Sequence, residues 1–270
     1  SDVDAMFVIP DGSGAEEQAA AARLVRLACD LVGKPGPDPA MVVDADLRPE
    51  GKGGPLVRTV SSYLSYYARW SSVWEAQALL RARSAAGEQE LASAVLEGVE
   101  GLRYPDGGLT AAQVAEIRRL KSRMENERIP RGTDKERHLK LGSGGLSDVE
   151  WTIQLLQLRH ARGCAALRVT GTRAAIGAAR GAGLLGDEDA GTLLGAWELA
   201  SRIRAGNALA SGRMTGDKLD ILGRDARDLA PLARILGYPR GSEGALEERW
   251  RQSARRARAV MEHVFWESDS

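Results

Sequence analysis

Apolar residues recur at spacings of three and four through almost all of the chain beyond residue 110, and this periodicity most constrains the fold. Such spacing gathers the apolar side chains on one face of an α-helix. Five segments carry it, at residues 110–128, 147–163, 172–183, 187–210 and 246–266. Internal similarity is weak, which argues against a solenoid of repeats. We therefore predict a C-terminal helical bundle domain over residues 105–270.

Residues 1–104 have a mixed pattern. Short strands are expected at residues 5–9 and 41–49, the second ended by Pro49, and a helix at residues 16–32 with an apolar face. The members of that face are Leu24, Leu27, Ala28 and Leu31. A Gly-rich loop at 51–59 precedes an aromatic, mainly helical stretch at 61–83, for which a last strand at 78–84 is an alternative. The predicted fold class is α+β, mostly helical, with a small mixed sheet before the bundle.

Composition excludes several functional classes. The 270 residues include 37 Lys and Arg and 37 Asp and Glu, so no bulk charge attracts the chain to nucleic acid or to a membrane surface. Cys29 and Cys164 are far apart and are expected to be buried thiols of a reducing compartment. The histidines are dispersed too, which argues against zinc. No apolar stretch nears the ~20 residues that a membrane span needs. We expect a soluble, cytoplasmic protein.

Acidic residues alternate with apolar ones in both strand candidates. Residues two apart in a strand point to the same face, about 7 Å apart, so Asp2 and Asp4 would share one face. The same argument places Asp44, Asp46 and Arg48 on one face of the second strand. If the two strands are neighbours, their carboxylates converge within roughly 5 Å. A solvated, frayed terminus is the plainer alternative for an isolated pair such as Asp2 and Asp4.

Converging carboxylates repel one another unless cations neutralise them. Two magnesium ions held by oxygen ligands are the usual solution in enzymes that transfer phosphoryl or nucleotidyl groups. Arg48, Glu75, Arg81 and Arg83 lie near enough in sequence to complete a triphosphate site, because a guanidinium offers forked donors to phosphate oxygens. Taken alone, Arg81 and Arg83 are more simply surface residues.

Several longer motifs occur in a fixed order along the chain. They read SDVDAMFV, VDADLRPEG, GPLVRT, YYARWSSVWEAQALLRAR, LKLGSGGLSDVEWTIQLLQLRHA and RRARAVMEHVFW. Together they resemble the C-terminal, adenylylating half of glutamine synthetase adenylyltransferase, especially its actinobacterial form. The resemblance runs through essentially the whole chain, and three of its motifs (VDADLRPEG, WEAQALLRAR and GGLSDVEW) are jointly very specific.

The resemblance implies a duplicated nucleotidyltransferase of the polymerase-beta-like fold. One half attaches AMP from ATP to a tyrosine of glutamine synthetase, and the other removes it by phosphorolysis. The PII signalling protein and glutamine set the balance. The implied partners are therefore glutamine synthetase, the PII protein and the N-terminal half of the same parent chain. The phosphorolytic half and a non-catalytic docking fragment are the alternatives.

Carried over position by position, the resemblance makes Asp2, Asp4 and Asp44 the metal ligands and catalytic carboxylates. Asp46 departs from the family, since many relatives have a basic residue there, and is a weaker candidate ligand. Ser1, Arg48, Glu75, Arg81, Arg83, Asp148 and Glu150 are expected at the nucleotide. Family members also have a strand, a Gly-rich turn and a helix before these acids, and these are absent from the sequence. We therefore expect magnesium-bound ATP to bind poorly to residues 1–270 alone, because the turn and helix supply backbone N–H groups to phosphate.

The motif GGLSDVE has two interpretations. In the first, Ser147 caps a helix and Glu150 completes a capping box three residues later. In the second, Asp148 and Glu150 face the nucleotide site. Among the remaining residues, Trp70, Trp74, Trp151 and Trp197 are expected in the core, the three histidines at the surface or at helix ends, and the charged residues 124–140 in a mobile connection.

Overall fold

The computed structural model describes residues 3–34, 36, 40–129, 132–213 and 216–267. The chain divides into two compact units, Ser1–Asp106 (unit 1) and Gly107–Ser270 (unit 2). Both are rich in helix, and the strands are confined to unit 1 within the described residues. This confirms a mostly helical α+β architecture. The assignment of the units as a nucleotidyltransferase domain and a bundle domain stays a prediction.

The strands of unit 1 are short and pair in parallel. In chain order they are β1 (Val3–Asp4), β2 (Phe7–Ile9), β3 (Val43–Asp44) and β4 (Val57–Thr59). β1 pairs with β3, and β2 pairs with β4, so one run of chain changes partner at residues 5–6. Parallel neighbours need a long crossover. Helix α1 (Ala15–Gly33) lies in both crossovers, from β1 to β3 and from β2 to β4, and the 3-10 turn η1 (Gly51–Gly53) lies between β3 and β4 in the chain.

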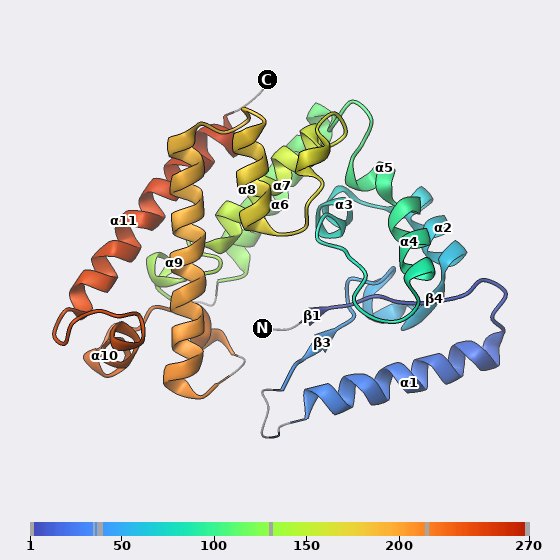
Figure 1. Cartoon of the computed structure of the whole chain (residues 1–270), viewed down its shortest axis with the longest axis horizontal. Coiled ribbons are helices and arrows are strands. Elements are labelled where there is room, and N and C mark those ends of the chain that lie inside the picture. The colour runs from blue at the N-terminus through green and yellow to red at the C-terminus, as the bar shows by residue number, and fades with distance from the viewer. Residues whose placement is uncertain (1–2, 35, 37–39, 130–131, 214–215, 268–270) are drawn as a thin grey trace. The chain divides into compact units, whose positions relative to one another are not determined.

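Four further helices follow the strands in unit 1 (Figure 1). They are α2 (Val60–Trp70), α3 (Val73–Leu79), α4 (Gln89–Gly98) and α5 (Glu100–Arg103). Two tyrosines of α2 anchor them: Tyr63 Oη donates to the Phe7 carbonyl (3.3 Å) and Tyr67 Oη to the Met6 sulfur (3.4 Å). Burial raises the pKa of Tyr63 to about 12. The core of unit 1 thus forms where α2 packs against residues 3–9, the run of chain that contains β1 and β2 and is called the strand run below.

Several sequence expectations for unit 1 are wrong. The strand expected at 41–49 is limited to Val43–Asp44, because a turn begins at Asp46. The alternative strand at 78–84 is absent from the described residues, where α3 ends at Leu79 and a turn follows. Helices α4 and α5 were not predicted. The apolar face expected of α1 is exposed: Leu24 retains 67% of its accessible surface, and Val25 turns inward instead.

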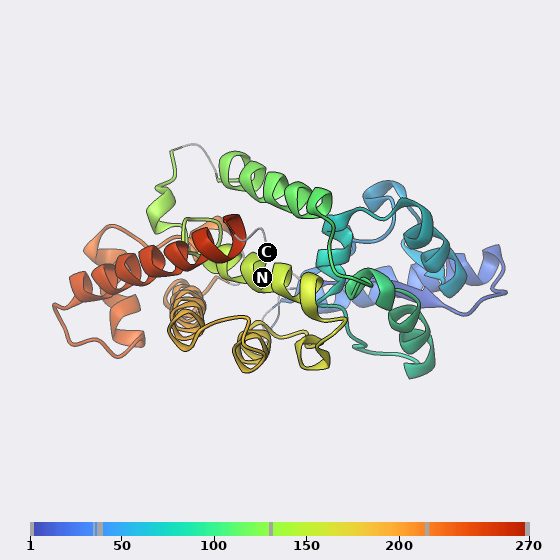
Figure 2. The ribbon, with the colours of Figure 1, turned by 90° about the horizontal axis from the view of Figure 1, so that it is seen from above.

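Unit 2 is built around one long helix. Helix α9 (Asp187–Ser211) packs against α7 (Leu146–His160), α8 (Thr172–Gly181), α10 (Ala226–Ile235) and α11 (Glu243–Met261). Figure 2 looks along α8 and α9, which lie side by side. The other elements are α6 (Ala111–Glu127), η2 (Lys135–Arg137), η3 (Ala165–Leu167), η4 (Asp217–Asp220) and a π-helical turn η5 (Glu262–Trp266). The five predicted helical segments are confirmed, and α10, which contains Pro231, was missed.

The charged segment before α7 is more ordered than expected. Arg137 is buried, donates to the carbonyls of Leu222 and Gly223, and pairs with Glu247 of α11. His138 is buried as well and forms a β-bridge with Ile221. Trp250 of α11, completely buried, donates its indole N–H to the Glu136 carbonyl (2.8 Å). Residues 137–139 are therefore part of the unit 2 core, which corrects the prediction of a mobile connection and of a surface His138.

No helix among the described residues has the length and apolar character needed to cross a membrane. Cys29 and Cys164 are free thiols, only partly buried.

His138 makes the stability of unit 2 dependent on pH. Its Nδ1 accepts the Leu141 N–H (3.2 Å), which requires that nitrogen to be unprotonated. Burial lowers the pKa of His138, although Asp220 and Asp217 oppose the shift. A group with a depressed folded pKa contributes stability above its unfolded pKa of about 6.5 and loses it as pH falls through the folded value. Between pH 7 and pH 5, we therefore expect thermal melts of the wild type to show a falling Tm.

The variant His138→Asn, whose side-chain oxygen can take the place of Nδ1, should show a smaller fall over the same range. His263→Gln is the matched control, because its hydrogen bond to Asp189 raises the pKa of His263 and gives the opposite pH dependence. An unchanged slope in His138→Asn would contradict the assignment to His138.

Candidate functional site

Two aspartates face each other in unit 1. Asp4 ends β1 and Asp44 ends β3, and the two residues are direct partners in the parallel register. Partners in parallel strands lie about 5 Å apart with side chains on the same face. Asp4 is exposed and Asp44 half-buried, so this face is open to solvent at Asp4. The expectation that the two acidic strands are neighbours is confirmed. Ser1 and Asp2 lie outside the described residues.

The Asp44 carboxylate is oriented by the backbone that follows it. Asp44 Oδ1 accepts the Asp46 N–H at 2.7 Å. The Asp46 side chain points into a different set of contacts, 3.4 Å from Lys52 and 3.5 Å from Arg48. Because β3 has already ended, the expectation of one strand face shared by Asp44, Asp46 and Arg48 is wrong. Asp46 therefore contributes to the site through its backbone N–H, which donates to Asp44, and not through its carboxylate.

Arg48 is mostly buried and fastens the loop in which it lies. Its Nη1 donates to the Ala45 carbonyl (2.7 Å), and its Nε to the Gly54 carbonyl (3.2 Å). A guanidinium used in this way shapes the loop after Asp44. Its contact with nucleotide phosphates stays a prediction.

Glu75 also has a structural contact of its own. Its carboxylate accepts the N–H (2.8 Å) and the hydroxyl (3.0 Å) of Ser72, the N-terminal cap of α3, and the residue is buried. This capping box satisfies backbone donors at the start of α3. The structure therefore supports a capping role for Glu75, and its contact with a nucleotide stays a prediction.

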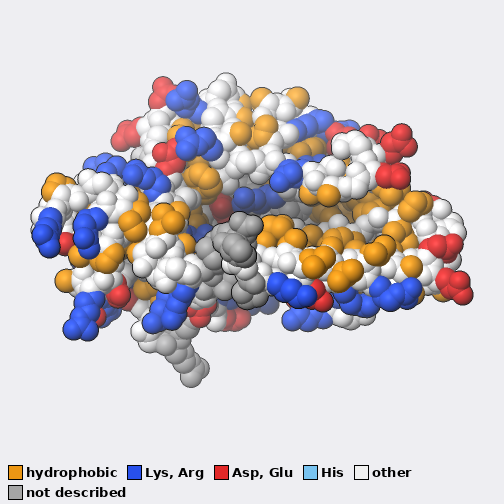
Figure 3. Space-filling view, turned by 60° about the horizontal axis from the view of Figure 1, so that its bottom comes forward, with side chains coloured by type: hydrophobic (Ala, Val, Ile, Leu, Met, Phe, Trp, Pro, Cys, Tyr) orange, Lys and Arg blue, Asp and Glu red, His pale blue; other side chains and the backbone are white. Residues whose placement is uncertain are grey.

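Arg81 and Arg83 lie on the turn and loop after α3, and both are exposed. They line a groove of about 750 Å³ in unit 1, whose wall also includes Asp4. Most of the remaining wall is apolar, from the strand run and from α1, α3 and α4. Figure 3 shows hydrophobic side chains gathered along α1 and beside it. The groove brings Asp4, Arg81 and Arg83 into one cavity, which is what an anionic ligand near the acidic pair would require.

The carboxylate pair suits a hard divalent cation. Carboxylate oxygens are the preferred ligands of Mg²⁺, which usually binds through one or two of them and keeps several waters. Asp4 and Asp44 provide two such groups on one face. Within the part of the chain that the structure describes, no group of three or more His, Cys, Asp or Glu side chains could hold a metal ion. The donor set thus fits magnesium with two described ligands, and Asp2 remains the expected third.

The GGLSDVE motif is built into the interior of unit 2. Helix α7 begins after Gly145, so Ser147 lies inside its first turn and the predicted capping box of Ser147 and Glu150 is wrong. Instead, Asp148 accepts the Gly144 N–H (2.7 Å). Gly144 has a left-handed φ of 71°, and a Cβ there would stand 1.8 Å from the Ala254 carbonyl oxygen. Only glycine fits where this loop meets α11.

Asp148 is completely buried among charges. Its carboxylate lies 2.5 Å from Lys121 Nζ on α6 and 3.2 Å from Arg258 Nη1 on α11. Glu125 contacts both cations, at 3.0 and 2.9 Å. Although burial alone would lower it, the pKa of Arg258 is raised by Asp148 and Glu125. The network joins α6, α7 and α11.

Glu150 is likewise engaged within unit 2, where Trp197 Nε1 donates to its Oε1 (3.3 Å). The contacts of Asp148 and Glu150 thus favour a structural role for both. Their predicted approach to a nucleotide stays a prediction without a contact that supports it.

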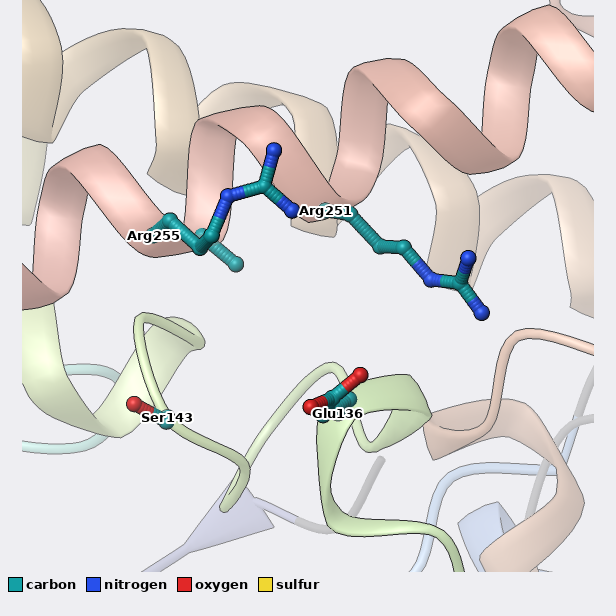
Figure 4. Close-up of a pocket in the computed structure, with 5 residues that line it drawn as sticks. Glu136, Ser143, Arg251 and Arg255 are labelled. Carbon is teal, nitrogen blue, oxygen red and sulfur yellow. The ribbon is translucent and has the colours of Figure 1, made fainter.

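A second, smaller pocket of about 140 Å³ lies in unit 2. Arg251 and Arg255 project from α11 over Ser143 and Glu136 (Figure 4). Arg251 pairs with Glu247 (2.7 Å) and Arg255 with Glu248 (3.4 Å). The pocket is polar, but its cations already have acidic neighbours on their own helix.

The predictions for the tryptophans and for the remaining histidines are only partly confirmed. Trp70 is 72% exposed and Trp74 is exposed too, so their assignment to the core is wrong. Trp151 and Trp197 are partly buried. His160 ends α7, as predicted, and His263 is an exposed residue of η5. Exposed Trp74 lines the groove of unit 1.

Comparison with known proteins gives two family matches and many relatives. Residues 1–98 match the family described as glutamate-ammonia ligase adenylyltransferase, and residues 112–265 match the family described as GlnD PII-uridylyltransferase. The chain is 50% identical over 269 residues to the bifunctional glutamine synthetase adenylyltransferase/adenylyl-removing enzyme of Streptomyces coelicolor. The enzymes of the same name from Cutibacterium acnes and Mycolicibacterium smegmatis are 48% and 44% identical. Each alignment covers 98% of this chain and 26% of the relative, so the chain spans about a quarter of their length.

The buried network predicts a large effect of a single charge removal. In Lys121→Met, Asp148 keeps Arg258 but loses its closest cation in a site with no access to water. We expect the free energy of unfolding to fall by about 3–5 kcal/mol, the usual cost of breaking a buried ion pair from one side. Urea denaturation followed by circular dichroism measures it. The exposed Lys140→Met is the matched control and should change stability by less than about 0.5 kcal/mol. A loss below about 1 kcal/mol in Lys121→Met would refute the structural assignment.

Proposed function

Because the chain belongs to the glutamine synthetase adenylyltransferase family, we propose that it is the adenylylating part of such an enzyme. It would take part in transferring AMP from ATP to a tyrosine of glutamine synthetase, with release of pyrophosphate, and so in the control of nitrogen assimilation. Motif resemblance favours the adenylylating half, through the sequence VWEAQALLRA (residues 73–82) and the VFW ending (residues 264–266).

One observation supports a nucleotidyltransferase site above all others, the in-register pairing of Asp4 with Asp44. Two acids side by side on paired strands of a small parallel sheet bring two carboxylates within reach of one cation, and carboxylate oxygens are the ligands that Mg²⁺ prefers. The remainder of the strand face is apolar or engaged in backbone pairing.

Asp4 and Asp44, with Asp2, would hold magnesium, and ATP would be the nucleotide substrate. Bound magnesium would supply the positive charge that screens the phosphates and eases loss of the tyrosine proton. The chain itself would hold the carboxylates in place: Asp44 through the Asp46 amide, and Asp4 through the pairing of its strand with β3.

The reaction forms a bond between the tyrosine oxygen and the α-phosphorus and breaks the bond to the pyrophosphate leaving group. The proton of the tyrosine hydroxyl is lost to a base or to water. Negative charge grows on the leaving group during this step, and cationic side chains placed beforehand can stabilise it. Arg81 and Arg83, in the same groove as Asp4, are the proposed source of that charge. Arg48 would act mainly through the loop that it fastens.

The opposing, phosphorolytic activity is the second candidate, since the relatives are named for both reactions. Two incubations of the full-length protein separate the candidates. One supplies glutamine synthetase and ATP and measures AMP incorporation. The other supplies adenylylated synthetase and phosphate and measures AMP removal. The carboxylate pair should be needed for whichever reaction this chain performs.

Unit 2 offers a third proposal, that it recognises protein partners. Its match to a family described as a PII-uridylyltransferase supports an interaction with the PII signalling protein, alongside glutamine synthetase. A pull-down of PII protein by the full-length chain, repeated with a variant that lacks residues 107–270, tests it. Binding that is lost without residues 107–270, while ATP binding remains, would support a docking function.

The carboxylate pair generates the central test. In the full-length protein, Asp4→Asn and Asp44→Asn keep side-chain size but remove a charge from the pair. We expect AMP incorporation into glutamine synthetase to fall on the order of 100- to 1000-fold, as when one electrostatic stabiliser of a transition state is removed. Far-ultraviolet circular dichroism should be unchanged. Asp30→Asn, exposed on α1, is the matched control and should transfer AMP normally. Near-normal transfer by Asp4→Asn would rule the assignment out.

A further inference from the structure

The loop that follows Asp44 is fastened from outside by an arginine on another strand. Arg58 lies on β4, retains only 10% of its side-chain accessible surface, and reaches back over residues 49–50. Its Nη2 donates to Glu50 Oε2 at 2.6 Å and to the Pro49 carbonyl at 3.4 Å. Its Nη1 donates to Ser62 Oγ on α2 at 3.2 Å. One guanidinium thus ties the loop to β4 and to α2.

The loop adopts a conformation that it would not keep unaided. Glu50 has a left-handed φ of 63°, which costs free energy for a residue with a side chain. Gly54 has no room for a Cβ, because such an atom would stand 2.2 Å from the Pro49 carbonyl oxygen and 3.0 Å from Arg58 Nη2. Strain of this kind persists only where surrounding contacts hold it, and it gathers at functional sites. Here Arg48 holds the loop from within, at Ala45 and Gly54, and Arg58 holds Pro49 and Glu50 from β4.

The same loop orients one carboxylate of the pair. The Asp46 N–H bonds to Asp44 Oδ1, so a shift of residues 45–50 would release that carboxylate. Arg58 is in turn the register partner of Val8 in β2, which continues the strand run that carries Asp4. A path of rigid contacts therefore runs from the strand of Asp4, through β4 and Arg58, to the loop and to Asp44.

We propose that Arg58, acting through Glu50, is a positioning residue that holds the Asp4–Asp44 carboxylate pair in its binding geometry. The inference rests on the proposed function for the statement that the pair binds magnesium. The arrangement is not accounted for by stability alone: the guanidinium is largely removed from water, yet its only ionic partner among the described residues is Glu50, which is 61% exposed. Arg58 Nε is buried and has no hydrogen-bond partner in the described part of the chain.

Two measurements on the full-length protein test the proposal, and neither requires turnover. The first is hydrogen exchange without metal, read in peptides that cover residues 45–54. The second is Mn²⁺ binding followed by electron paramagnetic resonance, with Mn²⁺ in place of Mg²⁺. Asp44→Asn defines the part of the Mn²⁺ signal that belongs to this site. The variants are Arg58→Met, Arg58→Lys and Glu50→Gln, with Arg69→Met, exposed on α2, as the matched control.

In Arg58→Met, we expect faster exchange in residues 45–54 and Mn²⁺ affinity weaker by about 10- to 100-fold, the effect of losing a group that orients a metal ligand. Arg58→Lys keeps the positive charge but loses the two-pronged donor geometry of the guanidinium, so the Mn²⁺ affinity of this variant should lie between those of the wild type and Arg58→Met. Glu50→Gln removes the ion pair at an exposed position and should weaken Mn²⁺ binding with little change in Tm. The effects of Glu50→Gln and Arg58→Met should not add in the double variant.

A purely structural arginine would lower Tm while leaving Mn²⁺ affinity unchanged at temperatures where the protein is folded, and that result would overturn the proposal. If Arg58→Met does not fold, Glu50→Gln decides: wild-type exchange and wild-type Mn²⁺ affinity in that variant overturn it as well. Failure of the proposed function has a separate signature. The wild type would then not transfer AMP, while Mn²⁺ binding would still depend on Glu50 and Arg58.

Discussion

The parallel pairing of one short strand run with two later strands is the constraint on which unit 1 depends. The bonds from Val3 N–H to the Val42 carbonyl (2.8 Å) and from Ala5 N–H to the Asp44 carbonyl (2.7 Å) fix the register at Asp4 and Asp44. Each paired segment has only two or three residues, so the pairing gains little free energy by itself. Side chains must add to it, as the hydroxyls of Tyr63 and Tyr67 do from α2. The position of the acidic pair therefore depends on packing against α2 as much as on the sheet.

Charged residues are used in opposite ways in the two units. In unit 1, Asp4 and Asp44 are register partners at the ends of two short strands, with Asp4 exposed and Asp44 half-buried. In unit 2, Asp148 is buried and two cations surround it. Burial with full compensation indicates architecture, because an unpaired charge could not remain there. This contrast separates the acidic pair of unit 1 from the GGLSDVE motif, for which the sequence left a structural and a functional interpretation open.

Features that depend on residues close together in the sequence could be predicted, and features that depend on residues far apart in the sequence could not. The long helices of unit 2 follow from local periodicity, whereas alternation placed the acids on strand faces and left the pairing of the two acidic strands as a condition that the structure meets. The burial of Asp148 depends on Lys121 and Arg258, which are 27 and 110 residues away, and no local pattern announces them. Pro231 concealed α10, since a proline inside a periodic segment usually argues against a helix. Arg58 had no signal beyond its place in the motif GPLVRT, because its partners come from a loop conformation that the sequence does not specify.

The distribution of tryptophans gives the molecule two optical reporters with different solvent access. Trp250 is sealed in unit 2, while Trp70 stands 72% exposed in unit 1. A water-soluble quencher such as iodide reaches an exposed indole and is kept from a buried one, and the buried indole emits at shorter wavelength. Emission that resists quenching thus includes that of Trp250 in the unit 2 core, and quenchable emission comes largely from exposed indoles such as Trp70. A rise in the quenchable fraction therefore reports loosening of the unit 2 core around Trp250, because Trp70 is accessible to the quencher from the start.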